Sequence, residues 1–543
     1  MVYIGLLVLS LLPFSVGRQE PLGSALVSDQ YAVTATPAGA TKSIAIVGAG
    51  SGGLAALKTI LDLPKDVREG WEIELYEQRR DVGGVWLADP PGKLPDPPEL
   101  PETPLYPLLH TNTPHPTMTY PHFTFRPGTP LFPSHEYLWQ YHVDYADHFN
   151  LWPHIHLNHV VSSAAWRGDN ATGEWEVEIH AQVTGGCQNE TRAFKKTFDH
   201  LIVANGHNHY PYIPAWNGTD EWLGNTPPGF PEREILHSIY YRHPEKYTNR
   251  SVIIVGAGAS ARDAVLQVGP LARTAYQSLS EGSEPPPEAQ VITKPRISHF
   301  TKEAVVFIDG TSLDDVDSLI LGTGYEFRVP FLSVPRSNVL VTDPDTPYNS
   351  TTAPALTSNL RYIFPLHRQI FNLAPTLPTT ALAFVGLPVL IANAPSDAAQ
   401  GLLIAHALAN TSLLPPRDEM LRELVAHEDL LRLKGLDPYR VGHRLLGGDT
   451  EAQDYQDDLI DYVKKHGAIP DDGQKYVEQW RRTGRTLSRL LARAWKRVED
   501  RGEEARWLDG VETEDEWAQL MYRLAEWQEE WEKEHGESAN PYA

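Results

Sequence analysis

The chain has 543 residues, of which 41% are hydrophobic and 21% charged, and its formal net charge is −24 at pH 7. Its length predicts two or three domains, and its acidic excess argues against a nucleic-acid partner, because binding phosphates requires Lys and Arg gathered on one face. The single cysteine, Cys187, allows neither an intramolecular disulfide nor a redox-active one. No Cys/His cluster has the spacing of a metal site, so we expect no bound metal.

The N-terminus has the pattern of a secretory signal. Residues 4–12 are almost wholly apolar, and the small residues at 15–17 suit signal-peptide cleavage. Asn-X-Ser/Thr sequences, the acceptors for glycans, occur at Asn170, Asn189, Asn217, Asn249, Asn349 and Asn410. We expect residues 1–17 to be a signal peptide, residues 18–42 a polar linker, and the protein a glycoprotein, secreted or in the endoplasmic reticulum lumen. A cytoplasmic protein is the alternative, since no Lys or Arg precedes Arg18.

The first nucleotide-binding pattern opens the folded part of the chain. IAIVGAGSGG at 44–53 reads as a strand, a glycine turn and the start of a helix, which together cradle a dinucleotide pyrophosphate. Gly48 allows the tight turn, Gly50 lets backbone amides approach the phosphates, and Gly53 lets helix and strand pack closely. We expect these glycines and Ser51 to bind the cofactor.

Two further signatures indicate that this cofactor is FAD. The next strand ends in Glu77, whose carboxylate would accept hydrogen bonds from a ribose. Gly84 and Trp86 follow it in a GG-x-W sequence that resembles FAD-binding enzymes more than simple dehydrogenases. Further on, SLILGTGY at 318–325 is a buried strand ending in a Gly-Thr-Gly turn, and flavoproteins use such segments beside the cofactor. We therefore add Gly324 to the expected cofactor-binding residues.

A second nucleotide-binding pattern, VIIVGAGASARD, occupies residues 252–263. Ala261 replaces the third glycine, a substitution that the pattern tolerates and that is frequent where a nicotinamide cofactor binds. We expect Gly256, Gly258, Ser260 and Ala261 to bind NAD(P)H, which would deliver hydride to the flavin. Two enzyme classes use that pair of cofactors. A disulfide reductase needs a cysteine pair, which this chain lacks, whereas an oxygenase needs none.

The sequence changes character near residue 411, where charged helices begin. Thr513 and Glu516 have the spacing of a capping box, and an apolar stripe follows on one helix face. These helices could cover a substrate entrance or pair with another subunit, and the sequence leaves the oligomeric state open.

We predict an α/β fold with two Rossmann-like dinucleotide-binding domains and a helical C-terminal region. The predicted NAD(P) domain, 215–314, is inserted into an FAD domain formed by 43–214 and 315–410, and the helical region is 411–543.

Several ordered segments resemble the flavin-containing monooxygenases, which are class B flavoprotein monooxygenases, and most of all their fungal members. Among these segments are HTNTPHPTM at 110–118, ANGHNHYPYIP at 204–214 and HSIYYR at 237–242. The resemblance implies an FAD- and NAD(P)H-dependent monooxygenase that uses a C4a-hydroperoxyflavin to insert one oxygen of O₂ into an amine nitrogen or a sulfide or thiol sulfur of a small molecule. It places Asn112 beside the flavin as the catalytic residue and Ser278 at the NADP 2′-phosphate.

The departures from the family pattern leave alternatives open. His237 and Tyr241 are in place, but Arg233 stands at a glycine position of the identifying string. Tyr241 favours heteroatom oxygenation, because Baeyer–Villiger relatives, which act on ketones, carry Trp there. Such a ketone oxygenase, or a non-catalytic nucleotide-binding protein, is the alternative. Ser280 occupies the position of the phosphate-binding arginine, so Arg273, Lys294 or another cation replaces it, or NADH is used as well as NADPH.

Overall fold

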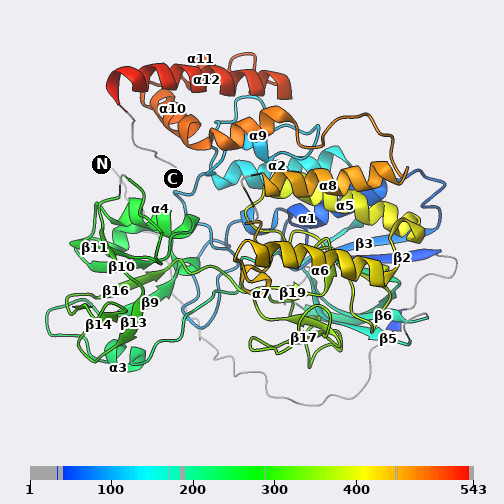
Figure 1. Ribbon diagram of the computed structural model, residues 1–543, viewed down its shortest axis with the longest axis horizontal. Helices are drawn as coiled ribbons and strands as arrows, with labels where there is room; N and C mark the ends of the chain where they lie inside the picture. Colours follow the sequence, from blue (N-terminus) through cyan, green and yellow to red (C-terminus); the bar gives the residue numbers. More distant parts are fainter. Residues whose placement is uncertain are drawn as a thin grey trace, which may run out of the picture.

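The structure, a computed structural model, describes residues 33–34, 41–169, 172–183, 190–287, 289–446, 448 and 450–536 (Figure 1). The predicted signal peptide, most of the predicted linker, and Asn170, Cys187 and Asn189 lie outside the described residues. Two α/β units stand side by side, and helices from the end of the chain run along one side of them. Among the described residues, no helix is long and apolar enough to cross a membrane.

The first unit is built on a seven-stranded sheet with the order β20-β21-β22-β8-β2-β3-β4. Its strands are β2 (Lys42–Val47), β3 (Trp71–Glu77), β4 (Ile155–Leu157), β8 (His200–Val203), β20 (Leu366–His367), β21 (Phe371–Asn372) and β22 (Leu382–Phe384). The central strand β2 is parallel to β3 and β8. Ile44 and Ile46 pack against helices on one face, whereas Ala45 and Val47 pack on the other. Burial on both faces explains the uninterrupted apolar run of this strand.

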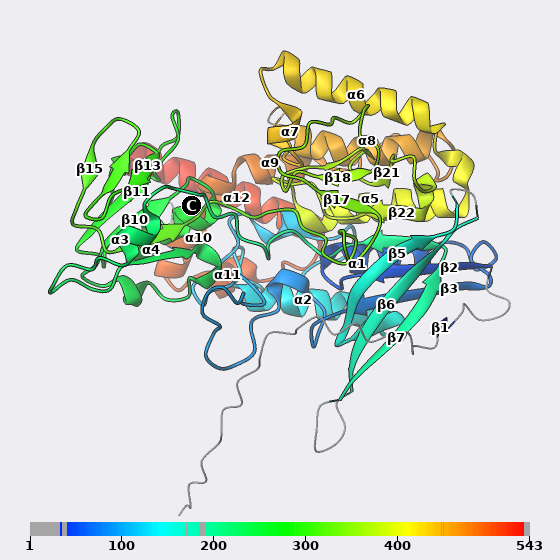
Figure 2. The ribbon, with the colours of Figure 1, turned by 90° about the horizontal axis from the view of Figure 1, so that it is seen from below.

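Different layers cover the two faces of this sheet. Helices α1 (Ser51–Leu61), α2 (His135–His148), α5 (Asn393–Ala409) and α8 (Glu451–Lys465) share the apolar core of one face. The other face packs against a four-stranded sheet with the order β1-β7-β6-β5, in which the long strands β5, β6 and β7 extend as a blade (Figure 2). Its strands are β1 (Val33–Thr34), β5 (His159–Arg167), β6 (Glu174–Val183) and β7 (Glu190–Phe198).

The second unit is built on a five-stranded parallel sheet with the order β12-β11-β10-β16-β9. Its strands are β9 (Glu234–His237), β10 (Ser251–Val255), β11 (Thr274–Ser278), β12 (Ile292–Lys294) and β16 (Ser318–Leu321). Helix α4 (Ala259–Val268) covers one face. On the other lie α3 (Thr219–Leu223) and the small sheet of β13 (Ile297–Phe300), β14 (Val305–Phe307) and β15 (Ser312–Leu313).

The position of β16 corrects one predicted boundary. The sequence analysis ends the second domain at residue 314, but β16 pairs with β10 on one side and with β9 on the other. The second unit therefore extends at least to Leu321. A sequence shows that a strand is buried but not which sheet it joins, because the pairing is set by a crossover connection.

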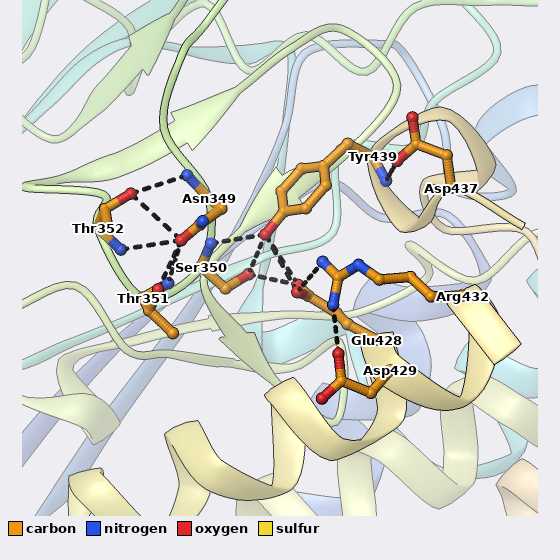
Figure 3. Close-up of polar contacts among 9 residues, drawn as sticks. All are labelled: Asn349, Ser350, Thr351, Thr352, Glu428, Asp429, Arg432, Asp437 and Tyr439. Atoms are coloured by element: carbon orange, nitrogen blue, oxygen red, sulfur yellow. Dashed lines mark hydrogen bonds and ion pairs between the residues drawn. The ribbon is translucent and has the colours of Figure 1, made fainter.

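Helices α6 (Arg417–Leu433) and α7 (Pro438–Val441) pack beside a small sheet of β17 (Leu340–Thr342), β18 (Leu356–Ser358) and β19 (Ile363–Phe364). A buried polar cluster joins them (Figure 3). Ser350 Oγ donates to the buried carboxylate of Glu428 at 2.5 Å, and the Tyr439 hydroxyl donates to the same carboxylate at 3.1 Å. Arg432 pairs with it at 3.2 Å, so each polar group of the cluster has a partner.

The C-terminal helices form a layer along the top of the view in Figure 1, over parts of both units. They are α9 (Gln479–Thr486), α10 (Ser488–Asp500), α11 (Glu504–Leu508) and α12 (Glu514–His535). The predicted capping box of Thr513 and Glu516 begins α12, and Trp517 is fully buried. Arg481 fixes α9 to the first unit, since its buried guanidinium donates to Pro116 O and to Thr119 Oγ1, both at 2.7 Å.

Candidate functional site

A cavity opens at the carboxyl ends of β2, β3 and β8, where a doubly wound sheet places its ligands. The predicted cofactor-binding residues that line it are Gly48, Gly50, Ser51, Glu77, Gly84 and Trp86. They come from the two turns that follow β2 and β3, so the first nucleotide-binding pattern and the GG-x-W sequence meet at one site.

Glycines shape the turn between β2 and α1 in two ways. Gly48 has φ +104°, a conformation that favours glycine, and a Cβ there would lie 2.4 Å from Ala204 O. Gly53 packs on the inner side of the turn, where a Cβ would lie 1.8 Å from Gly48 O. Gly53 therefore holds helix and turn together and is not among the residues that line the cavity.

Helix α1 begins at Gly50 with no side-chain cap from the described residues. The N–H groups of its first turn have no partner within the helix, and the helix dipole makes this end positive. Residues of the first turn line the cavity. The site therefore has the donors and the close backbone approach that a dinucleotide pyrophosphate needs.

Glu77, the last residue of β3, lines the cavity beside the glycine turn. Its carboxylate accepts the N–H of Ala49 at 2.7 Å and the N–H of Arg79 at 2.8 Å. Burial raises the pKa of Glu77, and both N–H contacts act in the opposite direction. Arg79 also donates to the carbonyls of Gly84 and Ala88, both at 2.9 Å, which fixes the glycine loop around the cavity.

Asp397, near the start of α5, is a cavity residue that the sequence analysis missed. It is 3% exposed, and burial raises the pKa of its carboxyl to about 7, opposed by a hydrogen bond with Ser51. The only sign of it in the sequence is a single carboxylate in a mostly apolar helix, and none of the motifs used above includes this position.

The second nucleotide-binding pattern forms the corresponding turn in the second unit. Gly256 has φ +114°, and a Cβ on it would lie 2.5 Å from Gly322 O. Gly258 is the N-cap of α4, again without a side-chain cap from the described part of the chain, and an added Cβ would meet no heavy atom within 4 Å. Ser260 and Ala261 follow in the first turn of α4, where the buried Ala261 packs against Gly322.

Ser278 and Gly324 have protein partners of their own. Ser278 is buried at the end of β11, and its hydroxyl donates to Pro295 O at 2.9 Å. The carbonyl of Gly324 accepts from Tyr212 N at 2.9 Å and from His237 Nε2 at 3.0 Å. Burial lowers the pKa of His237 to about 4, so the neutral ring ties β9 to the turn after β16. Gly324 does not line the first-unit cavity.

Direct contacts fix the two units relative to each other. The Tyr106 hydroxyl, from the loop of the first unit, donates to Asp263 on α4, and burial raises the pKa of Asp263 to about 6. Arg242, from the second unit, donates to Asp89 Oδ2 and to Thr103 O, both at 2.7 Å. These contacts therefore join the two units that carry α1 and α4, whose N-termini no side chain of the described residues caps.

The family model described as "Flavin-binding monooxygenase-like" matches residues 41–284 and 288–441 of the chain. This match covers both glycine turns and well over half of the chain. The chain belongs to this family. It is a flavin monooxygenase with two Rossmann-like units, as predicted from the sequence. Its last helices lie outside the matched residues.

Curated relatives and solved structures are similar to this flavin monooxygenase at modest identity. A flavin-containing monooxygenase, FMO GS-OX-like 9 of Arabidopsis thaliana, is 26% identical over 465 residues, 81% of this chain and 88% of that protein. The senecionine N-oxygenase of Tyria jacobaeae is 26% identical over 402 residues, 73% of this chain and 77% of that one. The structure of S-allyl-L-cysteine S-oxygenase from Allium sativum has a TM-score of 0.64 at 24% identity, covering 90% and 99% of the chains, and supports the fold.

Asn112 lies apart from the cavity residues of this flavin monooxygenase. Its side chain is exposed, in the loop between the bridge residue His110 and a short 3-10 helix, His115–Met118. His115 replaces the lysine usual in the family and is fully buried against Trp517, with ring centroids 4.4 Å apart, and burial lowers its pKa to about 3. The neutral ring lets the C-terminal layer pack directly on the loop that carries Asn112.

Arg233 has a structural role at the family's glycine position. It is 5% exposed and donates to the carbonyls of Trp222, Lys302 and Glu303 at 2.8–3.1 Å. This departure therefore stabilises the second unit. In the described part of the chain, no three His, Cys, Asp or Glu side chains are grouped as a metal site would require.

Proposed function

We propose that this flavin monooxygenase holds FAD in the first-unit cavity and NADPH on the second unit, and oxygenates an amine nitrogen or a sulfide or thiol sulfur of a small molecule. In the overall reaction, substrate, O₂, NADPH and a proton give the oxygenated substrate, NADP⁺ and water. The observation that carries the proposal is the pair of uncapped glycine turns fixed relative to each other by Tyr106 and Arg242. With Cys187 alone, the chain has no dithiol for the competing reductase chemistry.

The residues of the chain bind and shield the cofactors. When bound, the flavin accepts hydride from the nicotinamide and activates O₂. The first turn of α1 binds the pyrophosphate, and Glu77 accepts ribose hydroxyls through lone pairs that Ala49 and Arg79 leave free. The C-terminal layer covers the segment after Asn112 and keeps water from it. Asn112 does not line the first-unit cavity, and the family resemblance alone assigns its amide, which has donors and an acceptor, the role of orienting the reacting groups.

Tyr241 supports a heteroatom substrate over a ketone. It is buried, donates to Gln267 Oε1 at 2.7 Å and packs edge-on against Tyr106, where Baeyer–Villiger relatives carry the larger Trp. The test is product analysis with thioanisole, N,N-dimethylaniline and cyclohexanone. We expect a sulfoxide or an N-oxide and no lactone, and a lactone would identify the Baeyer–Villiger alternative.

Lys294 is the best replacement for the missing phosphate-binding arginine. Strands β11 and β12 are parallel and place Lys294 opposite Ser278, at the edge of the sheet where nucleotides bind. Arg273 precedes β11 and therefore lies at the opposite edge, beside Asp315 O at 3.2 Å. Lys294→Ala should raise the KM for NADPH and leave that for NADH unchanged, with Arg273→Ala as the control. Equal effects on both coenzymes would exclude this role of Lys294.

We also propose that the protein passes through the secretory pathway. All four acceptor asparagines among the described residues, Asn217, Asn249, Asn349 and Asn410, are exposed. Expression in eukaryotic cells followed by N-glycosidase treatment should lower the apparent mass. An unchanged mass would favour the cytoplasmic alternative.

A further inference from the structure

A second cavity, of about 800 Å³, lies between the C-terminal layer and the first unit. Its walls come from α8, α9 and the segment between them, from residues 117–122, and from the start of α5. Tyr476 holds this wall in place, since its hydroxyl donates to Pro395 O at 2.7 Å. The volume falls within the range of small-molecule sites.

This second cavity shares a wall with the cofactor cavity. The start of α5 contributes Ala392 and Pro395 to the second cavity, and Asn393 and Asp397 to the cofactor cavity. On another side it is bounded by Thr117, five positions after Asn112. A molecule in this space is therefore separated from the cofactor site by one helical turn. Its walls from α8 and α9 lie outside the residues matched by the family model.

The cations that line the second cavity are paired, with one exception among the described residues. Lys464 pairs with Asp472 at 2.5 Å, Arg481 with Glu514 at 2.6 Å, and Arg482 with Asp457 at 2.5 Å. Lys475 pairs with Asp461 at 2.6 Å. Arg485, on α9, has no hydrogen bond or ion pair from its guanidinium to the described part of the chain.

An unpaired guanidinium in a partly enclosed space is costly. Burial lowers the pKa of Arg485, and no carboxylate offsets this effect. A half-buried guanidinium without a counter-charge gains from binding an anion, and the position of Arg485 in a cavity wall leaves it open to an anion from outside the chain. A guanidinium binds a carboxylate through two parallel hydrogen bonds.

We propose that this cavity is a ligand chamber, separate from the cofactor cavity, and that Arg485 binds the carboxylate of a small molecule held in it. The inference goes beyond the proposed monooxygenase function, because turnover of an uncharged substrate does not need this chamber. The C-terminal layer then forms one wall of a binding site.

The test compares three sulfides on the FAD-loaded protein. S-methyl-L-cysteine has a carboxylate and an amine, 3-(methylthio)propionate has the carboxylate alone, and 2-(methylthio)ethylamine has the amine alone. Dissociation constants are measured by calorimetry for the wild type, Arg485→Gln and Arg485→Lys. Arg489→Gln, at an exposed position of α10, is the matched control. Turnover of thioanisole, which carries no charge, reports the oxygenase function separately.

We expect both carboxylates to bind more tightly than the amine alone, and Arg485→Gln to raise their dissociation constants by about 10- to 100-fold. Arg485→Lys should fall between, because it keeps the charge but loses the paired hydrogen bonds. Thioanisole turnover and FAD content should stay unchanged in these variants. Equal binding of all three sulfides by the wild type, or equal carboxylate binding by Arg485→Gln, would overturn the chamber. If the wild type does not oxygenate thioanisole, the monooxygenase function is contradicted. The calorimetry would still decide whether the chamber binds carboxylates.

Discussion

The N-cap glycine of α4 offers a selective way to disturb one cofactor. Gly258 has φ −73°, which alanine adopts without strain, and its added Cβ would meet no heavy atom within 4 Å. The free energy of unfolding should therefore change by less than about 0.5 kcal/mol. The methyl group would, however, stand where the pyrophosphate of the nicotinamide cofactor approaches the first turn of α4. Losing one charge-assisted hydrogen bond there should raise the dissociation constant of NADPH by about 10- to 100-fold.

Stopped-flow reduction without O₂ measures this effect. The rate of flavin bleaching is followed against NADPH concentration for the wild type and Gly258→Ala, and FAD content and melting temperature are recorded for both. We expect a higher apparent dissociation constant with unchanged FAD content.

Gly53→Ala is the matched comparison in the first unit. There the added Cβ would lie 1.8 Å from Gly48 O, an overlap that only a shift of α1 can relieve. We expect loss of FAD and a lower melting temperature. The reasoning holds that the turn at Gly258 is open to the cofactor, whereas Gly53 packs against the protein. It would be refuted if Gly258→Ala bound NADPH as tightly as the wild type, or if Gly53→Ala kept its full FAD content.

Three further changes test other parts of the site. Asn112→Ser should retain FAD but release more hydrogen peroxide per NADPH, and an unchanged ratio would remove Asn112 from the reacting groups. Burial raises the pKa of Asp397 to about 7, so the contribution of this residue to stability is full below pH ~4 and is lost as pH rises to ~7, by on the order of 4 kcal/mol in total. Asp397→Asn should remove this loss, seen as a melting-temperature difference from the wild type that grows between about pH 4 and pH 7, whereas a constant difference would contradict the raised pKa. Arg481→Met should remove the hydrogen bonds of a buried guanidinium to Pro116 O and Thr119 Oγ1 and its ion pair with the half-buried Glu514, at a cost of about 1–3 kcal/mol, and should speed proteolysis of the C-terminal layer relative to Arg489→Gln, whereas equal rates would show that Arg481 does not hold this layer.

Local patterns predicted the two nucleotide-binding turns because each is encoded within about ten consecutive residues. Gly48, Gly50 and Glu77 line one cavity, as their spacing indicated. The sequence did not predict which sheet β16 joins, because the apolar residues of a buried strand do not specify its neighbouring strands. Asp397 was also missed, because its importance arises from burial beside Ser51, a residue 346 positions earlier in the sequence.

Non-local packing also explains the remaining differences. Ala261 occupies a glycine position because it packs against Gly322, which supplies the space instead. The sequence showed α9 only as part of a region of charged helices. Only the folded chain shows that Arg481 and Arg482 are paired and that Arg485 lines a cavity.

The most direct test of the central claim is the fate of isotopically labelled O₂ during NADPH oxidation with thioanisole present. A two-nucleotide flavin monooxygenase should place one labelled atom in the sulfoxide for each NADPH consumed, with the second atom in water. Hydrogen peroxide formed in equal amount to the NADPH consumed, with no label in the sulfoxide, would contradict the assignment.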